Sequence, residues 1–257
     1  VVSFLFGWTK LLVVRPGSIA SIAFVFAGYA AYLVPLSAWG IKATAACAIW
    51  TVTVLNLFGL RPGRTAQNLL AGTKVLGLVL LVLSGLLLGM AGPERMEEAG
   101  TTTSLPGAFG MALIFVMWTY GGWNESTYVA GEMRRPTRDL PASIAIGILG
   151  VLVLYVSINA VYVSCVPLQK MAGSEMVAAL LAERAFGGTG GSVIAVMVMV
   201  FALGALNGLV LTGARISYAF GSDYRVLGRL AAVHERYRTP AAALLLNGLW
   251  ATVLVVS

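Results

Sequence analysis

The chain has 257 residues, of which 59% are hydrophobic and 11% are charged, and its formal net charge is +7 at neutral pH. Soluble globular domains carry about 25% charged and about 45–50% apolar residues, and a soluble domain still leaves much of its surface in water. This composition therefore excludes a soluble enzyme, a coiled coil, a disordered chain and a disulfide-rich scaffold. The lipid bilayer is the expected environment.

Seven apolar stretches follow one another along the chain, and a bilayer crossing needs roughly 20 apolar helical residues. We therefore predict an all-α, polytopic membrane protein with one transmembrane domain over residues 1–257. The first stretch would measure about 51 Å as a straight helix, so we expect it to tilt strongly or to bend at Pro16. The predicted spans are residues 1–34, 43–60, 66–90, 108–130, 142–166, 192–219 and 241–257.

Basic residues are distributed unevenly among the loops between these spans. Loops 61–65, 131–141 and 220–240 are rich in arginine, whereas the alternating loops hold few basic residues. By the positive-inside rule, the arginine-rich loops face the cytoplasm of a plasma or inner membrane. No basic stripe interleaved with exposed aromatic residues is present, so the net charge does not indicate nucleic-acid binding. The arginines of the cytoplasmic loops are Arg61, Arg64, Arg134, Arg135, Arg138, Arg225, Arg229, Arg236 and Arg238.

The two ends of the sequence both fall within apolar stretches. The chain opens without a starting methionine, and its seventh stretch is barely long enough to cross a bilayer. We therefore expect this chain to be a piece of a larger membrane protein.

The span at 108–130 is interrupted near its middle. Gly121 and Gly122 are poor helix formers, each costing about 1 kcal/mol relative to alanine, and the polar Asn124 and Glu125 follow at once. Main-chain groups that are freed at membrane depth are tolerated where they line a cavity or are buried in protein. We predict a broken helix at about residues 118–124, whose free carbonyls suit an ammonium group and whose free amides suit an anion. The alternative is a glycine pair that only lets helices pack closely.

Three segments of the chain carry recognisable sequence patterns. They are Tyr120-Gly-Gly-Trp-Asn124 with the following Glu132-Met-Arg-Arg-Pro-Thr-Arg-Asp-Leu-Pro141, Leu11-Leu-Val-Val-Arg-Pro16, and Asn207-Gly-Leu-Val-Leu-Thr-Gly-Ala-Arg215. These segments resemble the sixth, third and eighth spans of L-type amino acid transporters in the amino acid/polyamine/organocation superfamily. The resemblance implies a sodium-independent secondary amino acid permease or exchanger with a five-plus-five inverted repeat. The seven spans would be the family's third to ninth.

The resemblance also implies which residues contact the substrate. Backbone carbonyls of Trp118, Thr119 and Gly121 would hold the substrate ammonium, the side chain of Trp118 would form an aromatic gate, and Asn124 would add a polar contact. The family's carboxylate-binding turn lies in its first span, which precedes the part matched here. The remaining predicted pocket residues are Tyr120 and Gly122 at the break, Glu125 after it, and Val14 and Ser18 on the first stretch.

Lys74 lies ten residues beyond Arg64, which is about 15 Å along a helix and therefore near the membrane midplane. A buried ammonium at that depth costs at least about 2.5–3.5 kcal/mol on insertion scales, so it needs a partner or a task. The family carries a lysine at this place, where its charge stands in for the sodium ion of sodium-coupled relatives. The alternative is a lysine satisfied by helix-end carbonyls without a role in coupling.

Glu125 departs from the family pattern, in which an aromatic residue is expected at this place. A carboxylate near the pocket would favour cationic substrates or titrate with a proton, which leaves a proton-coupled cationic amino acid or polyamine permease as an alternative function. A buried partner for a nearby basic residue is the structural alternative. A polytopic receptor or scaffold is a further alternative, although neither needs a glycine break beside Asn124 and Glu125.

The sequence predicts no cofactor, no metal site and no enzyme chemistry. The single histidine, His234, lies in a loop, and Cys47 and Cys165 lie inside apolar stretches, so no ligand cluster or catalytic set is present. Loop 35–42 has no cysteine, so we expect no disulfide-linked heavy chain. The expected partners are a small amino acid and the lipid bilayer.

Overall fold

The computed structural model describes residues 2–89, 105–174 and 176–257, and these contain helices without any strand. Five helical stretches are long and apolar enough to cross a membrane, namely Val2–Leu33, Ala38–Leu57, Gln67–Leu87, Pro136–Cys165 and Gly188–Asp223. Two apolar helices, Gly107–Met117 and Ala241–Val256, are shorter. The prediction of an all-α polytopic membrane protein is confirmed. The loop at 91–107, including Arg95, lies mostly outside the described residues.

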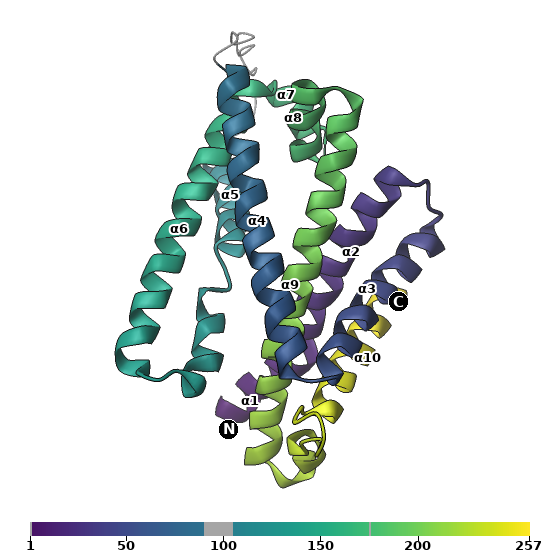
Figure 1. Cartoon of the computed structure of the whole chain (residues 1–257), viewed down its shortest axis with the longest axis vertical. Coiled ribbons are helices and arrows are strands. Elements are labelled where there is room, and N and C mark those ends of the chain that lie inside the picture. The colour runs from purple at the N-terminus through teal and green to yellow at the C-terminus, as the bar shows by residue number, and fades with distance from the viewer. Residues whose placement is uncertain (1, 90–104, 175) are drawn as a thin grey trace. The chain divides into compact units, whose positions relative to one another are not determined.

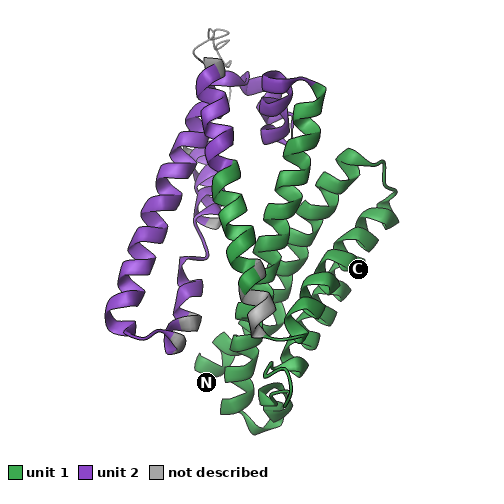
Figure 2. Ribbon diagram, viewed as in Figure 1, with its two compact units in different colours: residues 1–77, 188–257 green, residues 78–187 purple. Residues whose placement is uncertain are grey.

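The chain divides into two compact units, coloured separately in Figure 2. Unit 1 comprises residues 1–77 and 188–257, and unit 2 comprises residues 78–187. The single transmembrane domain over residues 1–257 stays a prediction. Unit 1 contains the helices α1 (Val2–Thr9), η1 (Lys10–Val14), α2 (Arg15–Leu33), α3 (Ala38–Leu57), α9 (Gly188–Asp223), η3 (Arg225–Ala231) and α10 (Ala241–Val256). It also contains the first part of α4 (Leu60–Gly89).

Unit 1 is held together by close packing of small side chains between α2, α3, α9 and α10, which lie against one another (Figure 1). Its buried core is rich in alanine, including Ala23, Ala27 and Ala45, which are fully inaccessible. Small residues let helix backbones approach closely, which is how helices associate in a bilayer, where burial of apolar surface gives no advantage over lipid. The apolar, alanine-rich composition of these helices therefore specifies their contacts with one another.

The first stretch contains an irregular turn just before the proline. A π-helical turn, η1, separates α1 from α2, and the backbone amide of Arg15 bonds to the carbonyl of Lys10. Pro16 has no N–H to donate, so the preceding turn loses a regular helical bond. The carbonyl of Leu12 instead accepts a hydrogen bond of 2.8 Å from the indole of Trp250. The irregularity that was expected at Pro16 thus takes the form of a π turn over residues 10–14.

A chain of buried amide groups links three helices of unit 1. Asn56 Nδ2 on α3 donates to Asn207 Oδ1 on α9 at 2.8 Å, and Asn207 Nδ2 donates to Gln67 Oε1 on α4 at 2.9 Å. Asn56 and Asn207 are almost completely buried. Buried polar groups in lipid-facing bundles join helices through such bonds, so this chain fixes how the start of α4 lies against α3 and α9.

We expect Asn207→Leu to lower the thermal unfolding temperature of the protein in detergent. The substitution removes both bonds and leaves buried polar groups unsatisfied, which costs about 1–3 kcal/mol per group. Asn159→Leu is the matched control, because Asn159 is exposed and donates a hydrogen bond to the carbonyl of Tyr155 within its own helix. Equal unfolding temperatures for the two variants would show that the amide chain contributes no stability.

Unit 2 contains the end of α4, α5 (Leu105–Thr119), η2 (Trp123–Glu132), α6 (Pro136–Cys165), α7 (Leu168–Ala172) and α8 (Val177–Phe186). α6 begins with Pro136 in its first turn, where a missing N–H costs nothing, and Asp139 in the same turn complements the positive end of the helix. The Cys165 thiol near the end of α6 donates to the carbonyl of Gly85 on α4. α6 also packs against η2, and this places α6 beside the interrupted span.

Candidate functional site

The predicted broken helix is present between α5 and η2. At the end of α5 the amide of Tyr120 bonds to the carbonyl of Val116 at 2.9 Å. Gly122 then adopts φ +89°, a left-handed conformation that a side chain disfavours. The chain resumes as the 3₁₀ helix η2, and the amide of Glu125 bonds to the carbonyl of Gly122 at 2.9 Å. The α-helix therefore stops at Thr119 and is not continuous through the membrane stretch.

One helix ends and another begins within a few residues here. The end of an α-helix leaves its last carbonyls without helical donors, at the negative end of the helix dipole. The start of a helix likewise leaves its first amides without helical acceptors. Side-chain hydroxyls supply some local partners, because Thr119 Oγ1 donates to Phe115 O at 2.8 Å and Ser126 Oγ donates to Trp123 O at 3.0 Å. The break is therefore the place in unit 2 where helix-end main-chain groups of both kinds come together.

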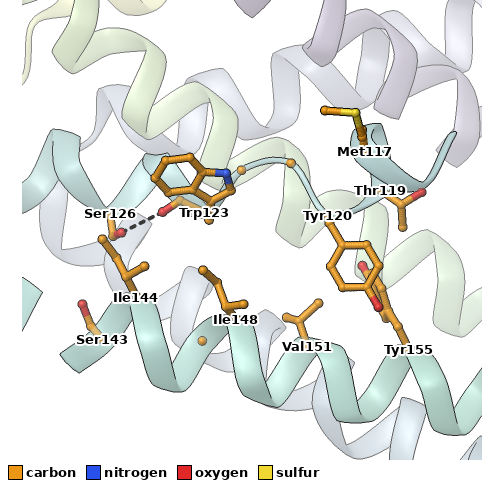
Figure 3. Close-up of a pocket in the computed structure, with 13 residues that line it drawn as sticks. Met117, Thr119, Tyr120, Trp123, Ser126, Ser143, Ile144, Ile148, Val151 and Tyr155 are labelled. Atoms are coloured by element: carbon orange, nitrogen blue, oxygen red, sulfur yellow. Dashed lines mark hydrogen bonds between the residues drawn. The ribbon is translucent and has the colours of Figure 1, made fainter. Parts of the chain in front are cut away.

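A cavity of about 650 Å³ lies between the break and α6, within unit 2 (Figure 3). Small-molecule sites typically have volumes of about 300–1,000 Å³. In Figure 3 the chain from Thr119 to Trp123 forms one side of the cavity and α6 forms the other. Its lining residues are Met117, Thr119, Tyr120, Gly121, Gly122, Trp123, Ser126, Ser143, Ile144, Gly147, Ile148, Val151 and Tyr155.

The cavity brings together four residues that the sequence proposed for the site. Thr119, Tyr120, Gly121 and Gly122 line it together. Asn124 and Glu125 are half-buried in η2, and they are not among the lining residues. The carbonyl of Asn124 accepts a hydrogen bond of 2.6 Å from Thr127 Oγ1.

The other predicted site residues lie elsewhere in the structure. The backbone of Trp118 belongs to the last turn of α5, and its side chain, the predicted gate, lies outside the described part. Val14 and Ser18 belong to unit 1, where Ser18 Oγ donates to the carbonyl of Val14 at 2.8 Å. Lys74 is half-buried at the midpoint of α4, also in unit 1. The pocket role of Val14 and Ser18 stays a prediction.

The α6 side of the cavity was missed from the sequence. Six of its residues, from Ser143 to Tyr155, line the cavity. α6 is apolar around most of its circumference, so no hydrophobic periodicity distinguishes the face that meets the break. The one available signal was the short loop between η2 and α6, which forces the two helices to be neighbours.

Tyr120 also contacts α6 directly. Its ring meets the ring of Tyr155 edge to face, with centroids 5.2 Å apart and planes at 72°. Edge-to-face aromatic pairs are favourable contacts beyond the area that they bury. The first residue after α5 is thereby held against the neighbouring helix.

Comparison with known proteins assigns the chain to a family. The family model described as "Amino acid permease" matches residues 1–257. The chain belongs to the amino acid permease family. The resemblance to L-type permeases of the amino acid/polyamine/organocation superfamily is confirmed. The family and its named members are transporters and not enzymes.

Named relatives of this permease chain come from animals and bacteria. The chain is 32% identical over 263 residues to the b(0,+)-type amino acid transporter 1 of Oryctolagus cuniculus, covering 99% of this chain and 53% of the relative. It is 27% identical over 244 residues to the serine/threonine exchanger SteT of Bacillus subtilis, covering 94% and 55%. It is 28% identical over 262 residues to the large neutral amino acids transporter small subunit 2 of Mus musculus, covering 97% and 49%. The permease chain thus spans about half the length of the curated relatives it matches.

Proposed function

We propose that the whole protein carries amino acids across a membrane and binds them at the break between α5 and η2. The carbonyls of Trp118, Thr119 and Gly121 receive the substrate ammonium, because they lie where α5 ends and the negative end of its dipole faces the gap. The observation that carries the proposal is the left-handed Gly122 directly beside a cavity of ligand size. Membership of the amino acid permease family supports the same substrate class.

Uptake of radiolabelled amino acids by the whole protein in proteoliposomes tests this proposal. Unlabelled leucine is compared as a competitor with its 2-hydroxy acid analogue, which has the same side chain and carboxylate but no ammonium group. The proposal expects competition by the amino acid and none by the analogue at equal concentration. Absence of any amino acid uptake, or equal competition by both compounds, would contradict it.

We also propose that transport is independent of sodium and that the ammonium of Lys74 takes the place of a sodium ion. Lys74 is half-buried halfway along a 30-residue helix, and an ammonium at membrane depth is retained only where it has a task or a partner. We place the protein in the plasma or inner membrane, with loops 61–65, 131–141 and 220–240 in the cytoplasm.

One relative is named a small subunit, which raises the question of a second chain. Loop 35–42 of this chain contains no cysteine, so we propose that the permease works without a disulfide-linked heavy chain. Electrophoresis of the membrane-embedded protein with and without reductant tests this, and a band that shifts on reduction would contradict it.

We expect Glu125→Gln to leave the ratio of lysine to leucine uptake unchanged within about twofold between pH 5.5 and 7.5. Glu125 does not line the cavity, and it lies in the first turn of η2, where a carboxylate complements the helix dipole with an effect of only about 0.3–1 kcal/mol. A selective loss of lysine uptake in the variant would instead support a permease for cationic substrates. Loss of the pH dependence of uptake in the variant would support proton coupling.

A further inference from the structure

The segment between α9 and α10 gathers basic residues at one end of unit 1. We call residues 224–240 the arginine loop, and Figure 1 shows it beyond the end of α9, where α9 lies beside α1. The acidic residues at or near this loop are Asp223 and Glu235. They are outnumbered by four exposed arginines, Arg225, Arg229, Arg236 and Arg238. The arginine loop therefore presents an excess of positive charge to its surroundings.

The short helix η3 in this loop has a packed face and an exposed face. Side chains three residues apart share a face of a 3₁₀ helix. Leu227 and Leu230 form the packed face, because Leu230 is buried with Phe220 of α9 and Leu227 packs against the same cluster. Val226 and Arg229 share another face, where Val226 is 95% exposed and Arg229 is exposed as well. An apolar side chain and a cation therefore project together from η3.

Both ends of the arginine loop are fixed by contacts with neighbouring helices. The end of α9 lies so close to η3 that a methyl group added at Gly221 would lie 2.8 Å from the carbonyl oxygen of Leu227. Near α10, Thr239 Oγ1 donates a hydrogen bond of 3.3 Å to the carbonyl of Leu57 at the end of α3. The backbone that carries the arginines is thus ordered before any ligand arrives, which lowers the entropic cost of binding one.

Aromatic side chains gather where the arginine loop begins. Phe4 of α1, Phe220 of α9 and Tyr224 form a cluster with ring centroids 4.8–5.4 Å apart. Trp8 of α1 stacks on Phe4 with centroids 5.9 Å apart. Tyrosine and tryptophan concentrate at the level of the lipid headgroups, where a bilayer meets water. Because Arg225 follows Tyr224 directly, this cluster puts the start of the arginine loop at the depth of the lipid phosphates.

We propose that the arginine loop binds the headgroup of an anionic phospholipid, with Arg225 and Arg229 at the phosphate and Val226 in the adjoining acyl region. Arginine suits this ligand because its planar fork donates paired hydrogen bonds to phosphate oxygens. A helix that carries a cation beside an exposed apolar residue is suited to the bilayer surface, since the apolar side chain leaves water there.

The orientation proposed above puts the arginine loop at the cytoplasmic leaflet, whose surface is negatively charged. Arg236 and Arg238, in the segment before α10, add to the attraction. The lipid surface lies wholly in unit 1, whereas the cavity beside the break belongs to unit 2. The inference therefore does not depend on where the amino acid binds.

Titration of the whole purified protein in detergent with phosphatidylglycerol tests the inference, with the thermal unfolding temperature as the readout. A ligand that binds the folded protein raises this temperature. We expect phosphatidylglycerol to raise it, and phosphatidylcholine and glycerol 3-phosphate to leave it unchanged at the same concentrations. The double variant Arg225→Gln with Arg229→Gln should need about 30 times more phosphatidylglycerol for a half-maximal shift, because each basic residue near an anionic surface contributes about fivefold in affinity.

Arg134→Gln with Arg135→Gln is the matched control, because it removes the same charge from two exposed arginines in the loop before α6. This control should titrate as the wild type does. Val226→Ser keeps every charge and should raise the half-maximal concentration about threefold, since less apolar surface leaves water. Elution in detergent without added lipid checks that each variant is folded.

Three results would overturn the inference. Equal losses in the two double variants would show that diffuse charge, and not the arginine loop, attracts the lipid. An equal shift with glycerol 3-phosphate would identify a site for a free anion. A wild-type protein that responds equally to phosphatidylcholine and phosphatidylglycerol would show that the loop has no preference for an anionic headgroup.

Discussion

Replacing Gly122 by valine should reduce amino acid uptake on the order of 100-fold while the protein remains folded. Gly122 adopts φ +89° at the break, and a β-branched residue is a steric outlier in that conformation. The backbone must then move to relieve the clash, and a shift of about 1 Å in groups that bind a substrate can cost on the order of 100-fold in rate. No neighbouring atom lies within 4 Å of an added methyl group, so the effect comes from the backbone conformation and not from crowding.

Gly110→Val is the matched control for this prediction. Gly110 lies within the regular part of α5, and a methyl group added there also meets open space. Uptake is measured in proteoliposomes, and circular dichroism with the elution profile in detergent reports on folding. If the two variants transported equally well, the left-handed turn at Gly122 would have no part in substrate binding.

Replacing Lys74 by methionine should slow uptake on the order of 100-fold, and sodium should not restore it. Methionine keeps the length and the apolar stem of the side chain but removes the charge. Hydrogen bonds to charged groups contribute about 1.5–3 kcal/mol each. Each 1.4 kcal/mol or so corresponds to a factor of about ten, so losing the interactions of the ammonium group should slow uptake on the order of 100-fold. Wild-type uptake should be the same when sodium is replaced by choline.

Lys170→Met serves as the control, because Lys170 is exposed in the short helix α7 and carries the same charge. A wild-type protein that needs sodium would contradict the ion-mimic role of Lys74. Unchanged uptake by Lys74→Met would contradict it as well, and would favour a lysine that only satisfies helix-end carbonyls.

Hydropathy and length predicted the helical, polytopic fold because a bilayer allows few alternatives to apolar helices. The sequence also predicted the break, since a glycine pair followed by Asn124 and Glu125 is unfavourable in a membrane helix. It did not distinguish the roles of the two glycines. Of the two glycines, Gly122 has the left-handed conformation. Which glycine takes this conformation depends on the residue at which η2 begins, and the composition of the segment does not specify that residue.

The cavity beside the break was only half predictable. Thr119 through Gly122 belong to the interrupted segment itself, so their sequence marks them. The residues of α6 that line the cavity lie in a largely apolar span, where composition does not separate membrane-facing from cavity-facing positions. Only their packing distinguishes them. Val14 and Ser18 were predicted to line the substrate pocket, but they belong to unit 1 and the cavity belongs to unit 2. The hydrogen bond described for them joins the hydroxyl of Ser18 to the carbonyl of Val14.

Structure determination of the whole protein with a bound amino acid such as leucine tests the central claim most directly. The account predicts density for the ligand ammonium at about 2.7–3.2 Å from the carbonyls that end α5, with Gly122 in the left-handed conformation. A continuous α-helix from Met117 through Thr127, or an ammonium group bound away from the break, would contradict it.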